Sequence, residues 1–506
     1  MLELKNLSIT LSQNARPLAQ NLSFTLNQGD KAVIIGEEGN GKSSLLKLIY
    51  APQMIEGYCR HTGEIIKKGT VAYLPQSFPE EHLGHTIAEY FADINIPAHA
   101  RSLARIGISP DFVNSSQIIK TLSGGEKIKI QLAKILIAEP DILLLDEPTN
   151  DLDIETLQWL EGFINASRRP VLFISHDEML IERTANVIIH MEQLVRKTTA
   201  KTTVARSNYT DYIKSRGLAF DRQMQVAKKQ RADHKAQMDK WQQIYSRVDS
   251  DQSSISRQDP AGGRLLKKKM KSVLSTGRRL ARESEDFLDI PQQEESIITK
   301  FGSKITLPHG KTVLALDLPA LHIGSRQLCG QITLDITGPA HIGIIGRNGT
   351  GKSTLLKEIW ASLRERSDIT AAYMPQNYDE VLNFSQSAID FLSSDARKDT
   401  ITQVRTYLGS MKFTHDEMLG EISKLSGGQK AKILFLDMVL RNANVLILDE
   451  PTRNFSPLSA PEIRATLRAF GGAIISISHD RKYLAQVCDV IYELAPQGLK
   501  IRDDVV

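Results

Sequence analysis

The chain has little cysteine and no long apolar run, and each absence argues against a class of protein. Its 506 residues include only three cysteines, Cys59, Cys329 and Cys488, which lie far apart and form no CxxC pair. This usage suits a reducing compartment and argues against zinc and iron–sulfur sites. No stretch approaches the roughly 18 to 20 apolar residues of a membrane-spanning helix. The opening, MLELKNLSIT, lacks a basic segment followed by an apolar run, so we expect no signal peptide.

The composition that remains is that of a folded protein with several domains. Hydrophobic residues make up 41% of the chain and charged residues 24%, which is typical of globular proteins in water. The length allows two or three domains of ordinary size. Together with the missing membrane and export signals, these values predict a soluble cytoplasmic protein.

The chain contains an internal repeat of five segments. GEEGNGKSS (36–44) returns as GRNGTGKST (346–354), AYLPQ (72–76) as AYMPQ (372–376), and LSGGE (122–126) as LSGGQ (425–429). ILLLDEPT (142–149) returns as VLILDEPT (445–452), and ISHD (174–177) as ISHD (477–480). The differences 426 − 123, 449 − 146 and 479 − 176 all equal 303. Constant spacing of this kind indicates two copies of one folded unit.

Each copy is expected to fold as an α/β domain. Apolar runs at 32–36 and 342–346 suit buried parallel strands, and a leucine-rich helical segment follows each glycine loop. We place the first domain at 1–200 and the second at 301–506, with a basic helical linker at 201–300. The predicted fold class is therefore α/β, with two tandem phosphate-loop domains joined by an α-helical hairpin.

Both copies carry the pattern Gly-x4-Gly-Lys-Ser directly after an apolar run. The glycines let backbone N–H groups converge on phosphate oxygens, where a Cβ atom would intrude. Lys42 and Lys352 would contact the β- and γ-phosphates of ATP, and Ser43 and Ser353 would offer hydroxyl ligands to Mg²⁺. The first phosphate loop comprises Gly36, Glu37, Glu38, Gly39, Asn40, Gly41, Lys42, Ser43 and Ser44. The second comprises Gly346, Arg347, Asn348, Gly349, Thr350, Gly351, Lys352, Ser353 and Thr354.

Two carboxylates end a strand-like apolar run in each copy. Asp146 and Asp449, at the end of the run, would hold Mg²⁺ through water. Glu147 and Glu450 would orient the water that attacks the γ-phosphorus. The pattern predicts ATP hydrolysis with ATP and Mg²⁺ as its cofactors.

With LSGGE and LSGGQ, both copies resemble the ATP-binding cassette family. The resemblance implies that each signature faces the γ-phosphate of ATP held by the opposite copy, across a helix N-terminus. It implies that Gln76 and Gln376 sense Mg²⁺ and the nucleophile, and that His176 and His479 contact the γ-phosphate. Site one would then join the first loop to the second signature, and site two the reverse. The signatures consist of Ser123, Gly124, Gly125 and Glu126, and of Ser426, Gly427, Gly428 and Gln429.

Two departures from the family pattern stand out. The family often stacks adenine on an aromatic residue before the phosphate loop, but ITLSQNARP and LHIGSRQL contain none. The segment after the acid pair, the D-loop, reads TNDLD at 149–153 but TRNFSP at 452–457. Ser456 stands where the first copy has Asp153, so we expect the two sites to be inequivalent.

The basic charge of the chain is concentrated between the two copies. Residues 214–285 contain 18 Lys or Arg and 8 Asp or Glu, a net charge of +10, so the rest carries 4 − 10 = −6. Apolar residues at helical spacing predict two helices, with the tip of a hairpin at 253–263. We therefore interpret the basic hairpin as an element that binds a polyanion and not as a plain charged spacer. The candidate RNA-binding residues are Arg257, Arg264, Lys267, Lys268, Lys269 and Lys271.

The whole chain closely resembles the F-type ATP-binding cassette proteins. The resemblance implies that the ATP-bound form enters the E site of the 70S ribosome beside 23S rRNA, and that its linker contacts P-site tRNA. It further implies a monomer off the ribosome, with its two cassettes paired within the chain, and no membrane partner. The segments 256–271 and 450–459 resemble Lsa-like members, which protect ribosomes from lincosamides, pleuromutilins and streptogramin A.

Three other functions share parts of this pattern. A general F-type translation factor without a drug role would have the same catalytic residues. An importer-type twin ATPase would not need the basic hairpin, and a DNA-branch-binding protein would prefer junction DNA. Gln76 and Leu122 are 46 positions apart, and Gln376 and Leu425 are 49 apart, so the first copy carries no insertion between these residues. The resemblance implies that general factors often have an inserted arm at this place, so its absence favours the resistance-type factor.

Overall fold

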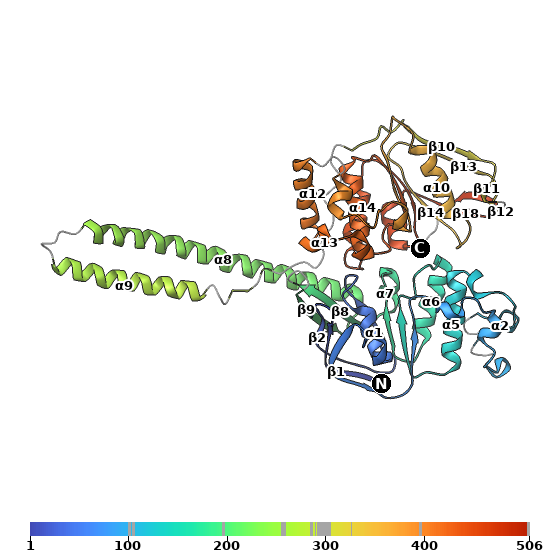
Figure 1. Cartoon of the computed structure of the whole chain (residues 1–506), viewed down its shortest axis with the longest axis horizontal. Coiled ribbons are helices and arrows are strands. Elements are labelled where there is room, and N and C mark those ends of the chain that lie inside the picture. The colour runs from blue at the N-terminus through green and yellow to red at the C-terminus, as the bar shows by residue number, and fades with distance from the viewer. Residues whose placement is uncertain are drawn as a thin grey trace. The chain divides into compact units, whose positions relative to one another are not determined.

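The computed structural model describes residues 1–99, 103, 107–194, 198–254, 260–283, 287–288, 290, 305–324, 326–393 and 397–502. The chain forms two compact units, drawn with their elements in Figure 1. One unit consists of Met1–Tyr209 with Glu294–Val506 and holds both copies of the repeat. The other, Thr210–Gln293, holds the linker.

The first copy is built on a six-stranded sheet with the order β5-β6-β7-β3-β8-β9. All neighbours are parallel except the pair of β8 and β9. Every residue of β3, β6 and β7 is buried, as expected where helices cover both faces of a parallel sheet. The strands are β3 (Lys31–Ile35), β5 (Val71–Leu74), β6 (Ile142–Asp146), β7 (Val171–Ile174), β8 (Val187–Leu194) and β9 (Thr199–Ala205).

Helices and a second, antiparallel sheet complete the first copy. The antiparallel sheet has the order β2-β1-β4 and contributes leucines to the core beneath α1. Its strands are β1 (Leu2–Leu11), β2 (Pro17–Leu26) and β4 (Cys59–Lys67). The helices of more than four residues are α1 (Lys42–Tyr50), α5 (Gly124–Ile137), α6 (Ile154–Ala166) and α7 (Glu178–Thr184) among the described residues.

The second copy repeats this sheet in the order β15-β16-β17-β14-β18-β19. The strands are β14 (His341–Ile345), β15 (Ala371–Met374), β16 (Val445–Asp449), β17 (Ala473–Ile477), β18 (Val490–Ala495) and β19 (Gly498–Ile501). Smaller pairs join β10 (Thr312–Leu318) to β13 (Ile332–Thr337) and β11 (Leu321–Ile323) to β12 (Arg326–Cys329). Its helices include α10 (Lys352–Leu363), α11 (Ala388–Leu392), α12 (Lys398–Ser410), α13 (His415–Leu419), α14 (Gly427–Leu440), α15 (Ala460–Arg468) and α16 (Arg481–Val487). The predicted fold class, with two tandem α/β domains, is confirmed.

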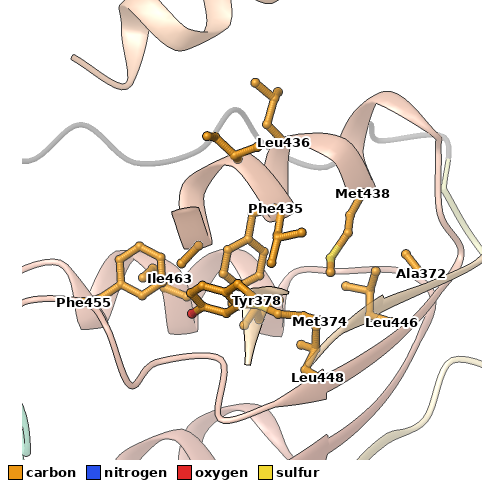
Figure 2. Close-up of a cluster of buried hydrophobic side chains, with 14 of the residues drawn as sticks. Ala372, Met374, Tyr378, Phe435, Leu436, Met438, Leu446, Leu448, Phe455 and Ile463 are labelled. Carbon is orange, nitrogen blue, oxygen red and sulfur yellow. The ribbon is translucent and has the colours of Figure 1, made fainter. Parts of the chain in front are cut away.

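The core of the second copy reaches the D-loop of that copy. Phe455, which is 2% exposed, packs on Phe435 of α14 with the ring centroids 6.0 Å apart. Tyr378 lies in the same cluster, and its hydroxyl accepts a hydrogen bond from Asn454 at 2.7 Å (Figure 2). The aromatic residue that distinguishes this D-loop from the first one is therefore a core side chain.

The linker unit is a pair of helices, α8 (Tyr209–Ser254) and α9 (Pro260–Glu283), which run side by side (Figure 1). Trp241 of α8 donates from its indole nitrogen to the Val273 carbonyl at 2.8 Å. A Cβ atom at Gly277 would lie 2.8 Å from the Trp241 ring, so the absent side chain lets the helices approach. Val248 and Leu280 are buried in this contact, although Leu274, expected on the same face, is 42% exposed.

The ends of the two linker helices differ from the expected tip at 253–263. Helix α8 continues to Ser254, and α9 already begins at Pro260 because proline fits the first turn of a helix. Arg257 lies outside the described residues. At the other end, β9 continues to Ala205, past the domain boundary expected at residue 200.

Candidate active site

The two glycine-rich loops connect β3 to α1 and β14 to α10. Gly36 has a φ of +144°, and a Cβ atom there would lie 2.2 Å from the Met191 carbonyl oxygen. Lys42 donates to the carbonyls of Gly36 and Glu37 at 2.8 and 3.0 Å, and Lys352 makes the same two bonds in the second loop. Each loop is therefore a backbone cradle closed by its own lysine, a geometry that fits a phosphate chain.

The end of β6 brings a carboxylate to the first loop. Ser43 donates to Asp146 at 2.8 Å, and the Tyr73 hydroxyl donates to the other carboxylate oxygen at 2.8 Å. Burial raises the pKa of Asp146 and of its counterpart Asp449 above the ordinary value. Hydroxyl and carboxylate oxygens are the ligands that Mg²⁺ prefers. Ser43 and Asp146 could therefore hold Mg²⁺ together with phosphate oxygens of the nucleotide.

The second signature meets the first loop. The Gly428 N–H, at the N-terminus of α14, donates to the Glu38 carboxylate at 2.6 Å. Ser426 forms a capping box with Gln429 at the start of this helix, as Ser123 does with Glu126 in α5. The contact places a negative charge at a helix N-terminus, where a phosphate would also be favoured.

The first signature meets the second loop across a cavity of about 450 Å³. Its lining includes Gly124 and the first D-loop from one copy, and Lys352, Ser353, Gln376 and the acid pair from the other. Ile323 and Leu328 line it close to the loop, where the family often has an aromatic residue. The structure thus brings together the residues expected for site two, with aliphatic side chains in place of an aromatic one.

Glu147 of site one is buried and bonded to a histidine. His176 Nε2 lies 3.0 Å from Glu147 Oε1. Burial works to raise the pKa of Glu147, but His176 and then Lys42 outweigh it, and the pKa falls below its ordinary value. The carboxylate is therefore ionised at neutral pH and able to orient a water molecule.

Glu450 of site two has a different environment. His479 Nε2 lies 3.7 Å from Glu450 Oε1, beyond hydrogen-bond distance, and His479 Nδ1 has no hydrogen-bond partner among the described residues. Burial and the adjacent Asp449 raise the pKa of Glu450 to about 8. Burial and nearby Lys352 lower the pKa of His479 to about 3. At neutral pH, site two therefore holds a neutral acid beside a neutral imidazole.

The D-loops carry contacts between the copies. His176 Nδ1 lies 2.7 Å from the Phe455 carbonyl, which can only accept, so Nδ1 carries the hydrogen. Arg453 pairs with Asp151 of the first D-loop at 3.0 Å. Ser456 and Asp153, the two residues expected to differ, are bonded differently. Asp153 caps α6 with its side chain, whereas Ser456 accepts from the Ser459 N–H at 3.4 Å ahead of α15, a helix without a side-chain cap.

A buried ion network joins the copies directly after His176 and His479, which we call the switch histidines. Arg481, 1% exposed, pairs with Glu161 of α6, and Arg464, 3% exposed, pairs with Glu178 of α7 at 2.7 Å. Lys482 also pairs with Glu178, at 2.8 Å. The residues after each histidine give the signal, since HDEMLIER is acidic and HDRK is basic, but only the fold shows that they face each other.

The two glutamines expected in the ATP sites differ in their surroundings. Gln76 and Gln376 are both exposed, but Gln376 also lines the cavity, and its amide reaches Asp151 at 3.5 Å. The contact of Glu38 with Gly428 agrees with the expected meeting of the first loop and the second signature, whereas the contacts of Phe455 and Arg481 had no prediction, because each partner lies hundreds of positions away in the chain.

A family model described as ABC transporter matches residues 19–150 and 329–453, half of the chain. The chain belongs to this family. Its two copies are tandem ATP-binding cassettes, and the protein is an ATPase. None of the described helices is long and apolar enough to cross a membrane.

Curated relatives match almost the whole chain. Putative ATP-binding protein YdiF of Bacillus subtilis is 27% identical over 97% of this chain and 80% of its own length. ABC transporter F family member 5 of Arabidopsis thaliana is 23% identical, over 96% and 74%. Probable ATP-binding protein YheS of Escherichia coli K12 is 26% identical, over 96% and 77%.

Solved structures share the fold at low sequence identity. The archaeal ribosome recycling factor aABCE1, in complex with stalk protein aP1, has a TM-score of 0.61 at 15% identity, over 98% of this chain and 89% of that one. RNase-L Inhibitor has a TM-score of 0.58 at 16% identity, over 97% and 89%. Both likenesses agree with the tandem-cassette architecture.

The geometry assigns distinct tasks in ATP hydrolysis. The loop N–H groups and the lysine would hold the phosphates, while the serine and aspartate would hold Mg²⁺, which neutralises charge on the phosphate oxygens. Glu147 would orient water for in-line attack on the γ-phosphorus, and the N-terminus of α14 would stabilise the charge that develops there. Site one has this arrangement ready, whereas site two must first ionise Glu450.

The two sites should differ in their dependence on pH. In a Glu147→Gln variant, single-turnover hydrolysis reports site two. Its rate should rise about tenfold from pH 6 to 7 and about fivefold from pH 7 to 8, as Glu450, with a pKa of about 8, loses its proton. In a Glu450→Gln variant, hydrolysis reports site one and should stay flat, because the pKa of Glu147 lies below its ordinary value. Two parallel profiles would contradict this assignment of the acids.

Removing one buried cation should weaken the pairing of the cassettes. Arg481→Met leaves Glu161 buried without this partner and should cost about 3 to 5 kcal/mol of stability, seen as a lower midpoint of thermal unfolding. Arg183 contacts the same carboxylate at 3.3 Å but its side chain is 43% exposed, so Arg183→Met should cost about 1 kcal/mol or less. Equal losses of stability in the two variants would show that burial of the Arg481–Glu161 pair does not increase its contribution.

Proposed function

We propose that this ATPase is an F-type translation factor that binds the ribosome in its ATP-bound form. It enters the E site, and the α8–α9 hairpin repositions P-site tRNA, protecting the ribosome from antibiotics that act at the peptidyl-transferase centre. The observation that carries the proposal is the exposed basic surface of α9. Its members are Arg264, Lys267, Lys268, Lys269, Lys271, Arg278, Arg279 and Arg282.

The chemistry of this surface favours a nucleic acid with its phosphates accessible. Lys267, Lys268 and Lys269 are all exposed in α9, and they form no ion pair among the described residues. Leu265, 72% exposed, adds an apolar contact beside them, of the kind that bases or riboses accept. The opposite charge of the rest of the chain argues against general adhesion to polyanions.

The names of the relatives point the same way. One of them is named as a member of the F family, and one solved neighbour is entitled a model of ribosome-bound archaeal Pelota and ABCE1. The fold shared with that neighbour has a TM-score of 0.58 over 98% of this chain. Two cassettes that close on ATP would form a rigid surface for ribosome binding. ATP hydrolysis would open them again and so limit how long this surface lasts.

Ribosome binding should depend on ATP and on the tip end of α9. A Glu147→Gln/Glu450→Gln variant should co-sediment with ribosomes in ATP but not in ADP. Replacing Lys267, Lys268 and Lys269 by Gln in that variant should weaken binding, because fewer phosphates are then neutralised. The slope of log affinity against log salt should fall by about 0.7 to 0.9 for each phosphate that the variant no longer neutralises.

The matched control replaces Arg278, Arg279 and Arg282 by Gln at the other end of α9, and it should weaken binding less. Failure of the double variant to co-sediment in ATP would refute the proposal. Nuclease-resistant affinity for junction DNA alone would favour the DNA-binding alternative, and recovery with membranes would favour the importer ATPase.

Drug protection separates this proposal from a general translation factor. Expression in a susceptible deletion host should raise the inhibitory concentrations of lincosamides, pleuromutilins and streptogramin A, whereas drugs acting elsewhere on the ribosome should be unaffected. The Lys267, Lys268 and Lys269 to Gln variant, tested in parallel, should lose the protection. Ribosome binding without any drug effect would leave the general factor as the better description.

A further inference from the structure

The first residue of the linker helix α8 contacts the D-loop of the second cassette. Tyr209 is 2% exposed, and its hydroxyl donates to the Pro457 carbonyl at 3.0 Å. Pro457 is two residues beyond Phe455, whose carbonyl accepts the hydrogen bond from His176 of site one. One short segment, 455–457, therefore lies between Tyr209 and the switch histidine.

This segment is anchored in the second cassette by the side chain of Phe455. Its ring packs against Phe435 in the core, and the preceding Asn454 is bonded to Tyr378 (Figure 2). These contacts hold the ring and the start of the D-loop. Ser456, in the middle of the segment, is also bonded to Ser459 ahead of α15, and Tyr209 adds a fixed point at the carbonyl of Pro457.

Site two lacks this arrangement. His479 Nδ1 has no hydrogen-bond partner among the residues that the structure describes. The offset of 303 pairs Pro457 with Ile154, which is the first residue of α6. The histidine that is held through its Nδ1 is the one that lies at 3.0 Å from its glutamate, and the other lies at 3.7 Å.

We propose that Tyr209 is a positioning residue for ATP hydrolysis at site one. Its hydroxyl fixes the segment 455–457, so that the Phe455 carbonyl accepts the hydrogen bond from His176 Nδ1 and the ring is held with Nε2 facing Glu147. An orienting bond on the far ring nitrogen determines which nitrogen faces the reacting groups. Tyr209 is also the first residue of α8, and it is joined to His176 through two hydrogen bonds, Tyr209–Pro457 and Phe455–His176.

The test is Tyr209→Phe, which removes one oxygen and keeps the ring. Single-turnover hydrolysis in the Glu450→Gln background reports site one, and its rate constant at saturating ATP should fall about fivefold. The ATP concentration for half-saturation should not change, because Tyr209 does not touch the phosphate loop. In the Glu147→Gln background, which reports site two, the rate constant should be unchanged.

The matched control is Tyr245→Phe, in the same helix, whose ring stacks on Trp241 with centroids 5.4 Å apart. It should leave both rate constants unchanged. An equal loss in both backgrounds would mean that Tyr209 only stabilises the fold. An unchanged site-one rate, or a change confined to the half-saturating concentration, would also overturn the proposal.

Discussion

The pairing of Arg481 and Arg464 with Glu161 and Glu178 is the interaction on which the composite ATP sites depend. Each site needs the phosphate loop of one cassette and the signature of the other, so the two must stay face to face. Ions buried in a low-dielectric interface are costly to separate, because each is then without its partner and does not regain full hydration. The network begins directly after His176 and His479, and it therefore holds the cassettes together close to the two histidines that are expected to meet the γ-phosphate.

The two ATP sites between the paired cassettes are chemically different. Site one has an ionised glutamate bonded to a histidine that is itself fixed by the opposite D-loop. Site two has a glutamate that keeps its proton at neutral pH and a histidine beyond hydrogen-bond distance. We expect one site to hydrolyse ATP readily and the slower site to govern how long the closed form lasts. A factor that must remain on its target for a set time needs such a difference.

The sequence predicted the strands before the phosphate loops and the loops themselves, because phosphate chemistry demands fixed residue types at fixed spacing, but it did not predict the antiparallel sheets such as β2-β1-β4. The strands β3 and β14 lie where the apolar runs at 32–36 and 342–346 indicated. The ion pairs between cassettes had no such signal, since Arg481 and Glu161 are 320 positions apart. The sequence marked the second D-loop as unusual at Ser456, but it gave no signal for the contact between the Phe455 carbonyl and His176 of the other cassette. The segment between the two linker helices is shorter than the predicted tip at 253–263. Proline can begin a helix as well as break one, and Pro260 begins α9.

We propose that ATP-dependent closure brings the basic hairpin to P-site tRNA. The most direct measurement is cryo-electron microscopy of ribosomes carrying the Glu147→Gln/Glu450→Gln variant with ATP. We expect density for both cassettes in the E site, with α8 and α9 beside the acceptor arm of P-site tRNA. Cassettes bound elsewhere on the ribosome, or a hairpin that does not touch RNA, would contradict the claim.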